Sequence, residues 1–249
     1  MNTRRDFITK SLVTVGATVL GTNAVQALNT TQSSKKITIR QNDIILFQGD
    51  SITDSGRDRN NLLANQTGAF GNGYAHIAAS HILNKYAKNN LKIYNRGISG
   101  NRVPDLIGRW QKEAIDLQPT ILSILIGVND FWRTMDSNAN NTPAAYKSQY
   151  QQLLDLTLKE LPNVKLIIGE PFGLKDVKHV SDAWYPEFPA YQSVSKEIAT
   201  EYNATFIPYQ AIFDAQLKNA NGAYWTTDGV HTSLAGANLM AESVVKVFK

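Results

Sequence analysis

The chain has 249 residues, of which 43% are hydrophobic and 18% are charged, and it contains no cysteine. This length and composition are typical of one globular domain with a substantial core. The formal net charge of +4 falls to +2 when residues 1–27, with three basic residues and one acidic residue, are left out. No basic cluster remains that would indicate nucleic-acid binding. Without cysteine, we expect no disulfide, thiolate chemistry or lipoprotein anchor.

The first 27 residues have the pattern of an export signal. Arg4 and Arg5 precede a short apolar stretch at residues 12–20, and small residues near Ala27 predict cleavage there. The apolar stretch is shorter than the ~20 residues that a membrane-spanning helix needs. We expect a twin-arginine signal peptide at 1–27, a flexible leader at 28–36 and one domain at 37–249. The expected location is periplasmic or secreted, without stable membrane insertion after cleavage; the alternative is a cytosolic protein with an ordinary basic N-terminus.

Strand-like and helix-like segments then alternate along the chain. Residues 37–40 predict a short edge strand, and the apolar runs that predict buried strands lie at 44–48, 91–95, 121–126, 165–169 and 205–208. The segments that predict helices lie at 74–88, 104–117, 143–161, 191–202 and 234–248. This alternation predicts an α/β fold. We expect a three-layer αβα sandwich around a doubly wound five-stranded parallel sheet, with the flavodoxin-like strand order 2-1-3-4-5.

Two expected loops are longer than usual, at residues 55–73 after the first strand and at 170–189 after the fourth. Long loops at strand ends commonly bind or cover a ligand. In a doubly wound sheet the ligand crevice lies at the carboxyl ends of the strands, where the strand order reverses. Ser51 and Asn129 follow strands on either side of that point, so the sequence places the candidate site there.

Ser51 is a candidate nucleophile because it lies at the end of a buried strand, beside glycine and ahead of a turn or short helix. A hydroxyl is a weak nucleophile and needs a base nearby. His231 can supply the base, and Asp228, three residues earlier, can orient its imidazole. Other interpretations remain open for each residue alone: Asp228 and the following glycine form a common turn pair, and His231 could cap the helix that begins near Ser233.

Four short blocks, at residues 49–57, 95–102, 126–132 and 228–231, together resemble the SGNH (GDSL-type) esterase superfamily. Their longer context is similar to bacterial carbohydrate-esterase-like members, and the resemblance runs from about residue 44 to the end of the chain. It implies a catalytic triad of Ser51, His231 and Asp228. It also implies an oxyanion hole made by the backbone N–H groups of Ser51 and Gly100 and the side-chain amide of Asn129. Many relatives have proline where Thr232 stands, a difference that concerns loop stiffness.

The remaining titratable candidates have simpler expected roles. Asp50 and Asp54 flank the nucleophile without a histidine or further acid at metal-ligand spacing, so we expect them to stabilise turns. His179 is a rival base, but its polar loop offers only Asp176 or Asp182 to orient it. No metal and no cofactor are expected.

Aromatic and arginine residues near the expected strand ends suggest the substrate. Indole rings can stack on sugars, and guanidinium groups can bond sugar hydroxyls or carboxylates; the candidates are Arg57, Arg102, Trp132, Arg133, Trp184 and Trp225. Core packing and loop salt bridges are the alternatives. The set favours a secreted serine esterase that removes small acyl groups, in particular O-acetyl, from an oligosaccharide or polysaccharide. The alternatives are a broad carboxylesterase, lysophospholipase or thioesterase acting on small molecules, and an inactive carbohydrate-binding domain.

Overall fold

The computed structural model describes residues 36–137 and 139–249, and within these residues five strands form one parallel sheet. The predicted signal peptide and the leader up to residue 35 lie outside the described residues. The strands are β1 (Ile44–Gly49), β2 (Lys92–Asn95), β3 (Ile121–Leu125), β4 (Lys165–Gly169) and β5 (Thr205–Ile207). Their order is β2-β1-β3-β4-β5, which confirms the predicted 2-1-3-4-5 topology.

The central strands are apolar because helices cover both faces of the sheet. Every residue of β3 is buried, and β1 is buried from Ile45 onward. β1 pairs in parallel with both β2 and β3, with Phe47 opposite Asn95 and Gly49 opposite Leu125. The carboxyl ends of these strands therefore meet at one edge of the sheet, which we call the carboxyl edge.

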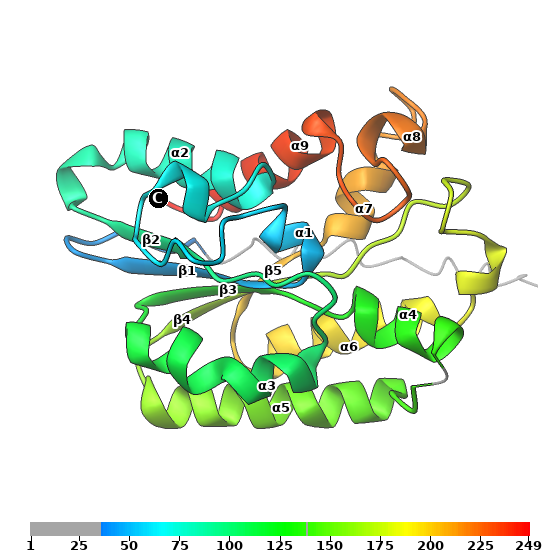
Figure 1. The fold of residues 1–249 in the computed structure, drawn as a ribbon, viewed down its shortest axis with the longest axis horizontal. Helices are drawn as coiled ribbons and strands as arrows, with labels where there is room; N and C mark the ends of the chain where they lie inside the picture. The colour runs from blue at the N-terminus through cyan, green and yellow to red at the C-terminus, as the bar shows by residue number, and fades with distance from the viewer. Residues whose placement is uncertain (1–35, 138) are drawn as a thin grey trace, which may run out of the picture. The chain divides into compact units, whose positions relative to one another are not determined.

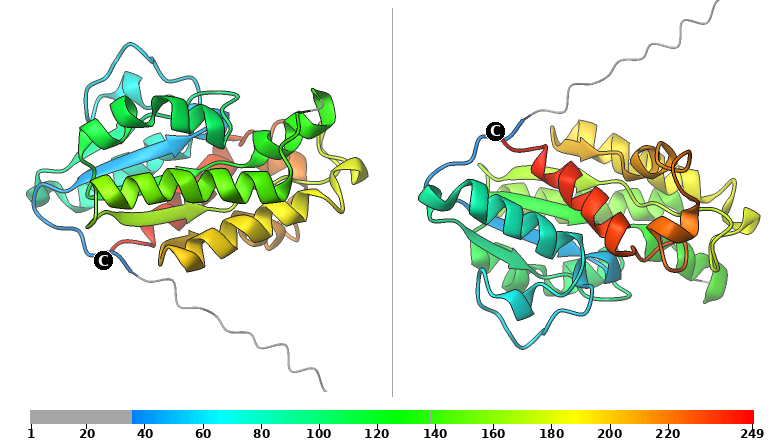
Figure 2. Two further views of the ribbon diagram at one scale, coloured as in Figure 1. Left: turned by 90° about the horizontal axis from the view of Figure 1, so that it is seen from below. Right: turned by 90° about the horizontal axis from the view of Figure 1, so that it is seen from above.

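The helices form two layers, one on each face of the sheet (Figures 1 and 2). One layer contains α2 (Tyr74–Lys85) and α9 (Leu234–Val245), and the other contains α3 (Val103–Glu113), α5 (Pro143–Glu160) and α6 (Phe188–Glu201). The predicted apolar stripe of α2 is buried at Ala75, Ala78 and Ile82, whereas His81 is exposed. The three-layer α/β sandwich is thus confirmed.

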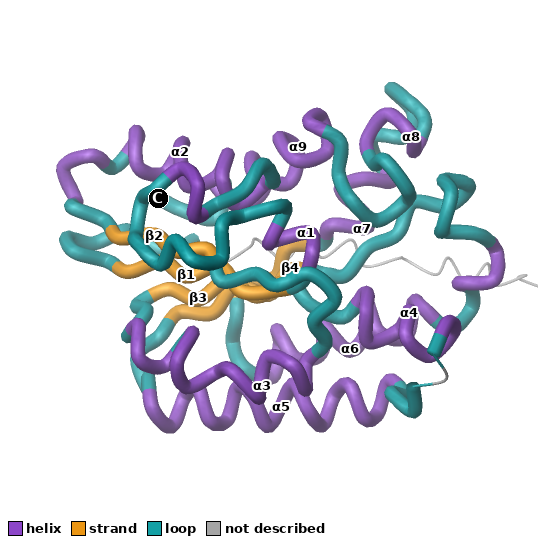
Figure 3. The backbone as a smooth tube through the Cα atoms, viewed as in Figure 1, coloured by secondary structure: helices purple, strands orange, loops and turns teal. Residues whose placement is uncertain are grey.

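Three helices at the carboxyl edge were not predicted: α4 (Val128–Asp136), α7 (Tyr209–Asp214) and α8 (Gly222–Trp225), whereas α1 (Ser51–Asp54) is the short helix expected, as an alternative to a turn, at Ser51. Figure 3 shows them among the loops that follow the strands. α7 and α8 have six and four residues, too few for a helical apolar stripe to be recognised. None of the helices in the described part of the chain is long and apolar enough to cross a membrane.

The prediction of an edge strand at residues 37–40 is wrong. Ile37 forms a single parallel bridge with Phe248, outside the five-stranded sheet. Its N–H donates to the Val247 carbonyl at 2.9 Å, and its own carbonyl accepts from the Lys249 N–H at 3.0 Å. Ile37 therefore pairs with the residues that follow α9 rather than with a strand of the sheet.

Candidate active site

Ser51 is the first residue of α1, directly after β1. The Asp50 side chain caps this helix, because its Oδ1 accepts from the Ile52 N–H at 2.9 Å. Asp50 and Ile52 are buried, whereas Ser51 is partly exposed. The end of the strand and the helix cap together hold the Ser51 hydroxyl at the carboxyl edge.

The side chain of His231 lies between Ser51 and Asp228. Its Nε2 is 2.8 Å from Ser51 Oγ, and its Nδ1 is 2.7 Å from Asp228 Oδ2. When Nδ1 carries its proton toward the carboxylate, Nε2 is the atom that accepts the Ser51 proton. The cap of α9 is Ser233, whose Oγ accepts from the Gly236 N–H at 3.2 Å, so the imidazole of His231 does not serve as that cap.

Asp228 is fixed by its own loop as well as by the imidazole. Its Oδ1 accepts from the backbone N–H groups of Val230 at 2.9 Å and His231 at 2.8 Å. Partial burial would raise the pKa of Asp228, but the backbone and side-chain hydrogen bonds from His231 outweigh it and hold the pKa below its ordinary value. The carboxylate therefore stays ionised and can stabilise a positive charge on the imidazole.

Gly100 and Asn129 lie on neighbouring segments of the same edge. Asn129 is in the first turn of α4, is buried, and donates from Nδ2 to the Asn101 carbonyl at 3.2 Å. Since a carboxamide has two N–H bonds, one can hold Asn101 while the other points at a ligand. Gly100 has a φ of +83°, and an added Cβ there would meet no atom within 4 Å. Glycine is thus required at 100 for its backbone conformation rather than for close packing within the protein.

Two buried carboxyl groups lie close to these segments. Asp50 and Asp130 are 1% and 0% exposed, and Oδ2 of each lacks a hydrogen-bond partner among the described residues. Burial raises the pKa of each to about 7, although hydrogen bonds from Ile52 to Asp50 and from Val103 and Asn141 to Asp130 oppose the shift. Asp130 was not recognised in the sequence, where it reads as an ordinary turn residue after Asn129.

Asp130 also joins the segments that carry Asn129 and Gly100. Its Oδ1 accepts from the Val103 N–H at 3.1 Å and from Asn141 Nδ2 at 2.9 Å. Val103 begins α3, three residues after Gly100. The side chain of Asp130 therefore ties the first turn of α4 to the loop before α3.

Asp54 and Arg57 brace the loop at residues 97–99. Asp54 Oδ2 accepts from the Ser99 N–H at 2.8 Å and pairs with Arg59, and Arg57 Nε donates to the Gly97 carbonyl at 2.8 Å. The contacts of Asp50 and Asp54 are thus the turn-stabilising bonds that were expected. Arg57 is only 6% exposed and its Nε is held by Gly97, whereas its Nη1 has no hydrogen-bond partner among the described residues, so its substrate-binding role stays a prediction.

The other proposed substrate contacts divide into buried and accessible side chains. Trp184 is 1% exposed and packs against Phe131 and Phe188, with ring centroids 5.1 and 5.0 Å apart. It is a core residue, so its prediction as a sugar contact is wrong. Arg102 and Arg133 are partly exposed and paired with Asp105 and Asp136, and Trp132 and Trp225 are partly exposed.

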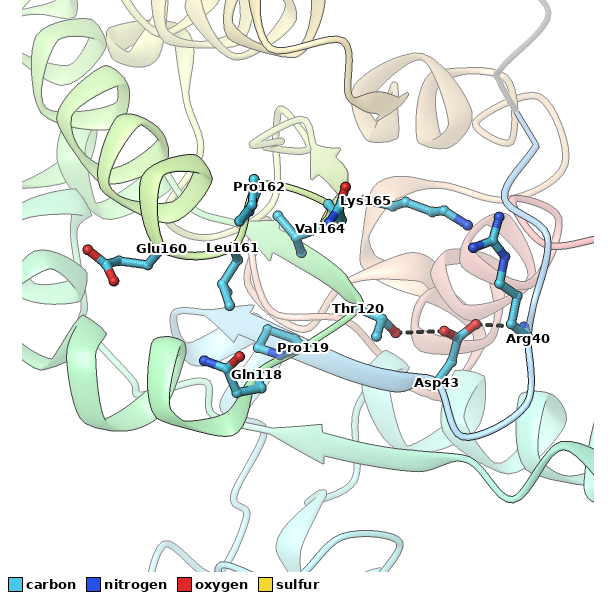
Figure 4. A pocket seen from close by; sticks show the side chains of 11 residues that line it. Arg40, Asp43, Gln118, Pro119, Thr120, Glu160, Leu161, Pro162, Val164 and Lys165 are labelled. Atoms are coloured by element: carbon cyan, nitrogen blue, oxygen red, sulfur yellow. Dashed lines mark hydrogen bonds between the residues drawn. The ribbon is translucent and has the colours of Figure 1, made fainter.

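A hollow of about 290 Å³ lies at the opposite edge of the sheet, where the strands begin. Figure 4 shows its lining side chains. Asp43, which lies beside it, accepts from Thr120 Oγ1 at 2.8 Å and from the Arg40 N–H at 2.6 Å. Neither serine nor histidine lines it, so its side chains do not pair a nucleophile with a base. Across residues 36–137 and 139–249, no three His, Asp or Glu side chains form a group suited to a metal ion.

Comparison with known proteins identifies the family to which the chain belongs. Residues 47–239 match the model of the GDSL-like lipase/acylhydrolase family. An acetylxylan esterase of Geobacillus stearothermophilus is 35% identical over 204 residues, which are 81% of this chain and 92% of that protein. A crystal structure described as a GDSL-like lipase from Parabacteroides merdae has 42% identity and a TM-score of 0.84, over 85% of this chain and 98% of that one.

The solved structures also include the Geobacillus acetylxylan esterase Axe2. It is 32% identical, with a TM-score of 0.76, over 85% of this chain and 96% of that one. Two further structures of Axe2 are described as catalytic mutants, one with an aspartate and one with a serine replaced by alanine. On the strength of the matched family model and the identity over most of both chains, the protein belongs to the GDSL-like lipase/acylhydrolase family and is a carboxylic ester hydrolase.

Proposed function

We propose that this protein is an exported serine esterase that removes O-acetyl groups from a carbohydrate. Ser51 is the nucleophile, His231 the general base and Asp228 the group that orients the imidazole. The observation that carries the proposal is the continuous contact from Ser51 Oγ to His231 Nε2, at 2.8 Å, and from His231 Nδ1 to Asp228 Oδ2, at 2.7 Å. This is the geometry that activates a hydroxyl for acyl transfer.

The reaction follows from the positions of these groups. Ser51 Oγ attacks the acetyl carbon while its proton passes to His231 Nε2, and the negative charge develops on the former carbonyl oxygen. The proposed donors to that oxygen are the N–H groups of Ser51 and Gly100 and the amide of Asn129. As the carbonyl re-forms, the sugar oxygen leaves with the proton from His231. Water then attacks the acetyl-enzyme with His231 again as base, and acetate leaves.

Similarity and accessible side chains support a carbohydrate ester as the substrate. The relatives of known structure include an esterase named for acetylated xylan. Trp132 offers a partly exposed indole one turn of α4 beyond Asn129. The export part of the proposal depends on residues 1–27, read as a twin-arginine signal before a leader at 28–36 and the domain at 37–249.

Acyl-chain preference and acetate release test the proposal. We expect acetate release from acetylated xylooligosaccharides, and p-nitrophenyl acetate should be hydrolysed much faster than p-nitrophenyl decanoate. Equal or faster turnover of the decanoate would instead favour a lipase-like or broad esterase, and hydrolysis of neither would favour a binding domain. Ser51→Ala should abolish turnover while the melting temperature stays close to that of the parent. Ser193→Ala, at an exposed position on α6, is the matched control and should remain fully active.

A further inference from the structure

The loop that follows β4 is fastened to the segment that carries Asp228. The Leu174 N–H donates to the Gly229 carbonyl at 2.8 Å, and the His179 N–H donates to the Asp228 carbonyl at 3.1 Å. Within this loop the side chains of Val177 and Val180 are buried, whereas His179 is exposed. The backbone of His179 is therefore held against Asp228 while its imidazole faces outward.

The imidazole of His179 is in contact with the indole of Trp132, which belongs to α4. The two ring centroids are 5.4 Å apart with an interplanar angle of 49°, and the ring of buried Trp184 lies 5.4 Å from that of Trp132. Figure 1 shows α4 beside the loop after β4, drawn in yellow tones, at the carboxyl edge. The Trp132–His179 pair thus bridges the helix that carries Asn129 and the loop bonded to Asp228.

We propose that the Trp132–His179 pair is a binding platform for a sugar ring next to the ester that Ser51 attacks. A partly exposed indole offers an apolar face to the C–H groups of a pyranose, and the imidazole offers a donor and an acceptor to its hydroxyls. The inference rests on the proposed function, and it names the side chains that would recognise the carbohydrate part of the substrate.

Two simpler roles for the pair fit the structure less well. His179 as an alternative base would have to displace His231, whose Nε2 already lies 2.8 Å from Ser51 Oγ. A purely structural role explains Trp132, which is partly buried and packs against the core, but does not explain the exposed imidazole of His179 on its ring. The pair lies on the two segments that carry Asn129 and contact Asp228, and aromatic side chains near a candidate site commonly bind a ligand.

Direct binding separates the platform from catalysis. The parent for these measurements is Ser51→Ala, in which a bound ester stays intact, and the ligand is an acetylated xylooligosaccharide titrated by calorimetry. Adding His179→Ala or Trp132→Leu should weaken binding about 10-fold each, the size expected for losing one aromatic contact. Adding His81→Ala, at an exposed histidine of α2, is the matched control and should leave the affinity unchanged.

The second measurement is steady-state kinetics of the same substitutions in a protein that keeps Ser51. His179→Ala and Trp132→Leu should raise KM for the oligosaccharide by a larger factor than KM for p-nitrophenyl acetate, which has no sugar ring to bind. An equal change in the kinetic constants for both substrates would overturn the proposed platform and show that the pair instead supports the catalytic groups. Unchanged affinity in the variants would overturn the platform alone, whereas no binding to Ser51→Ala and no acetate release by wild type would overturn the proposed function too.

Discussion

The two edges of the sheet differ in a way that volume alone does not reveal. The hollow of about 290 Å³ at the amino edge is lined by charged and polar side chains, and the side chains there stabilise the local structure. Asp43 bonds to Thr120 and to the backbone of Arg40, for example. At the carboxyl edge, a hydroxyl, an imidazole and a carboxylate make contact in sequence although 180 residues separate Ser51 from His231. Convergence of complementary groups, rather than size, distinguishes the edge suited to chemistry.

The edges also differ in how well their buried polar groups are satisfied. Both carboxylate oxygens of Asp43 accept hydrogen bonds, whereas Oδ2 of Asp50 and of Asp130 accepts none within the described residues. Gly229 adds a backbone with φ of +97° at the carboxyl edge. Unfavourable features of this kind are retained where a site requires them. We therefore expect substitutions at the carboxyl edge to change activity and those at the amino edge to leave it intact.

Replacing the proposed base should produce the largest contrast between the edges. His231→Ala removes the group that takes the Ser51 proton, so kcat for p-nitrophenyl acetate should fall by about 10⁴- to 10⁶-fold. Thr120→Val replaces a hydroxyl that lines the hollow at the amino edge with a methyl group and should change kcat by less than about twofold. A similar decrease in kcat in both variants would mean that the two edges do not differ in their importance for activity.

Asn129→Ala tests the proposed oxyanion donor. Loss of one such donor should lower kcat by about 10²- to 10³-fold with little change in KM, because the interaction forms in the transition state. The control is Asn163→Ala, an exposed asparagine that lines the hollow and should have no effect on kcat. If KM changed for Asn129→Ala while kcat did not, Asn129 would bind substrate rather than the developing charge.

Gly229→Ala tests how tightly the loop after β4 holds the Asp228 segment. An added Cβ would lie 2.6 Å from Val180 Cγ2 and 2.7 Å from the Val177 carbonyl oxygen, at a φ of +97° that alanine disfavours. We expect roughly 10- to 100-fold lower kcat and about 1–3 kcal/mol lower stability. Gly108→Ala is the control, because this exposed glycine in α3 meets no atom within 4 Å and its replacement should stabilise the helix by about 0.5–1 kcal/mol.

Asp130→Asn should change the stability of the protein by an amount that depends on pH, with no group of the proposed triad altered. Burial raises the pKa of Asp130 from 3.8 to about 7, so between these values the unfolded chain loses a proton that the folded protein keeps. The stability of the wild type therefore falls as pH rises across this window, and asparagine removes that loss. Relative to wild type, the unfolding free energy of Asp130→Asn should rise by about 3 kcal/mol from pH 4 to pH 7, because each pKa unit corresponds to about 1.4 kcal/mol.

Urea denaturation at pH 4, 5.5 and 7 measures this trend. A difference between Asp130→Asn and wild type that stays constant with pH would show that the carboxyl group is ionised in the folded protein. Asp43→Asn, at the amino edge, should lower stability because both carboxylate oxygens of Asp43 accept hydrogen bonds that asparagine cannot fully replace.

The sheet and its order were predictable because apolar runs and alternating helices are local signals. Strands such as β4 agree with their predicted residues, and helix ends differ by a few residues where 3₁₀ turns follow, as after Lys85. The edge strand predicted at residues 37–40 does not form, because Ile37 pairs with Phe248 near the chain end. The spacing of residues in the sequence does not indicate this contact. α4 was missed because its start at Val128 reads as a loop after a strand.

The residues of the candidate site were predictable to the extent that short motifs mark them. Ser51, Asp228 and His231 could be named from residue type and position, and Gly100 and Asn129 from the family resemblance. Burial could not be predicted in the same way: Arg57 and Trp184 are adjacent in sequence to exposed loops but lie inside the protein. Asp130 and the contact of His179 with Trp132 depend on segments brought together only by the fold.

Covalent labelling tests the central claim most directly. The wild-type protein is treated with a serine-directed phosphonofluoridate, and the adduct is located by intact mass and peptide mapping. The arrangement of Ser51 against His231 predicts a single adduct on Ser51, loss of activity in step with labelling, and no labelling of His231→Ala under the same conditions. An adduct on another residue, or activity that survives complete labelling of Ser51, would contradict the account.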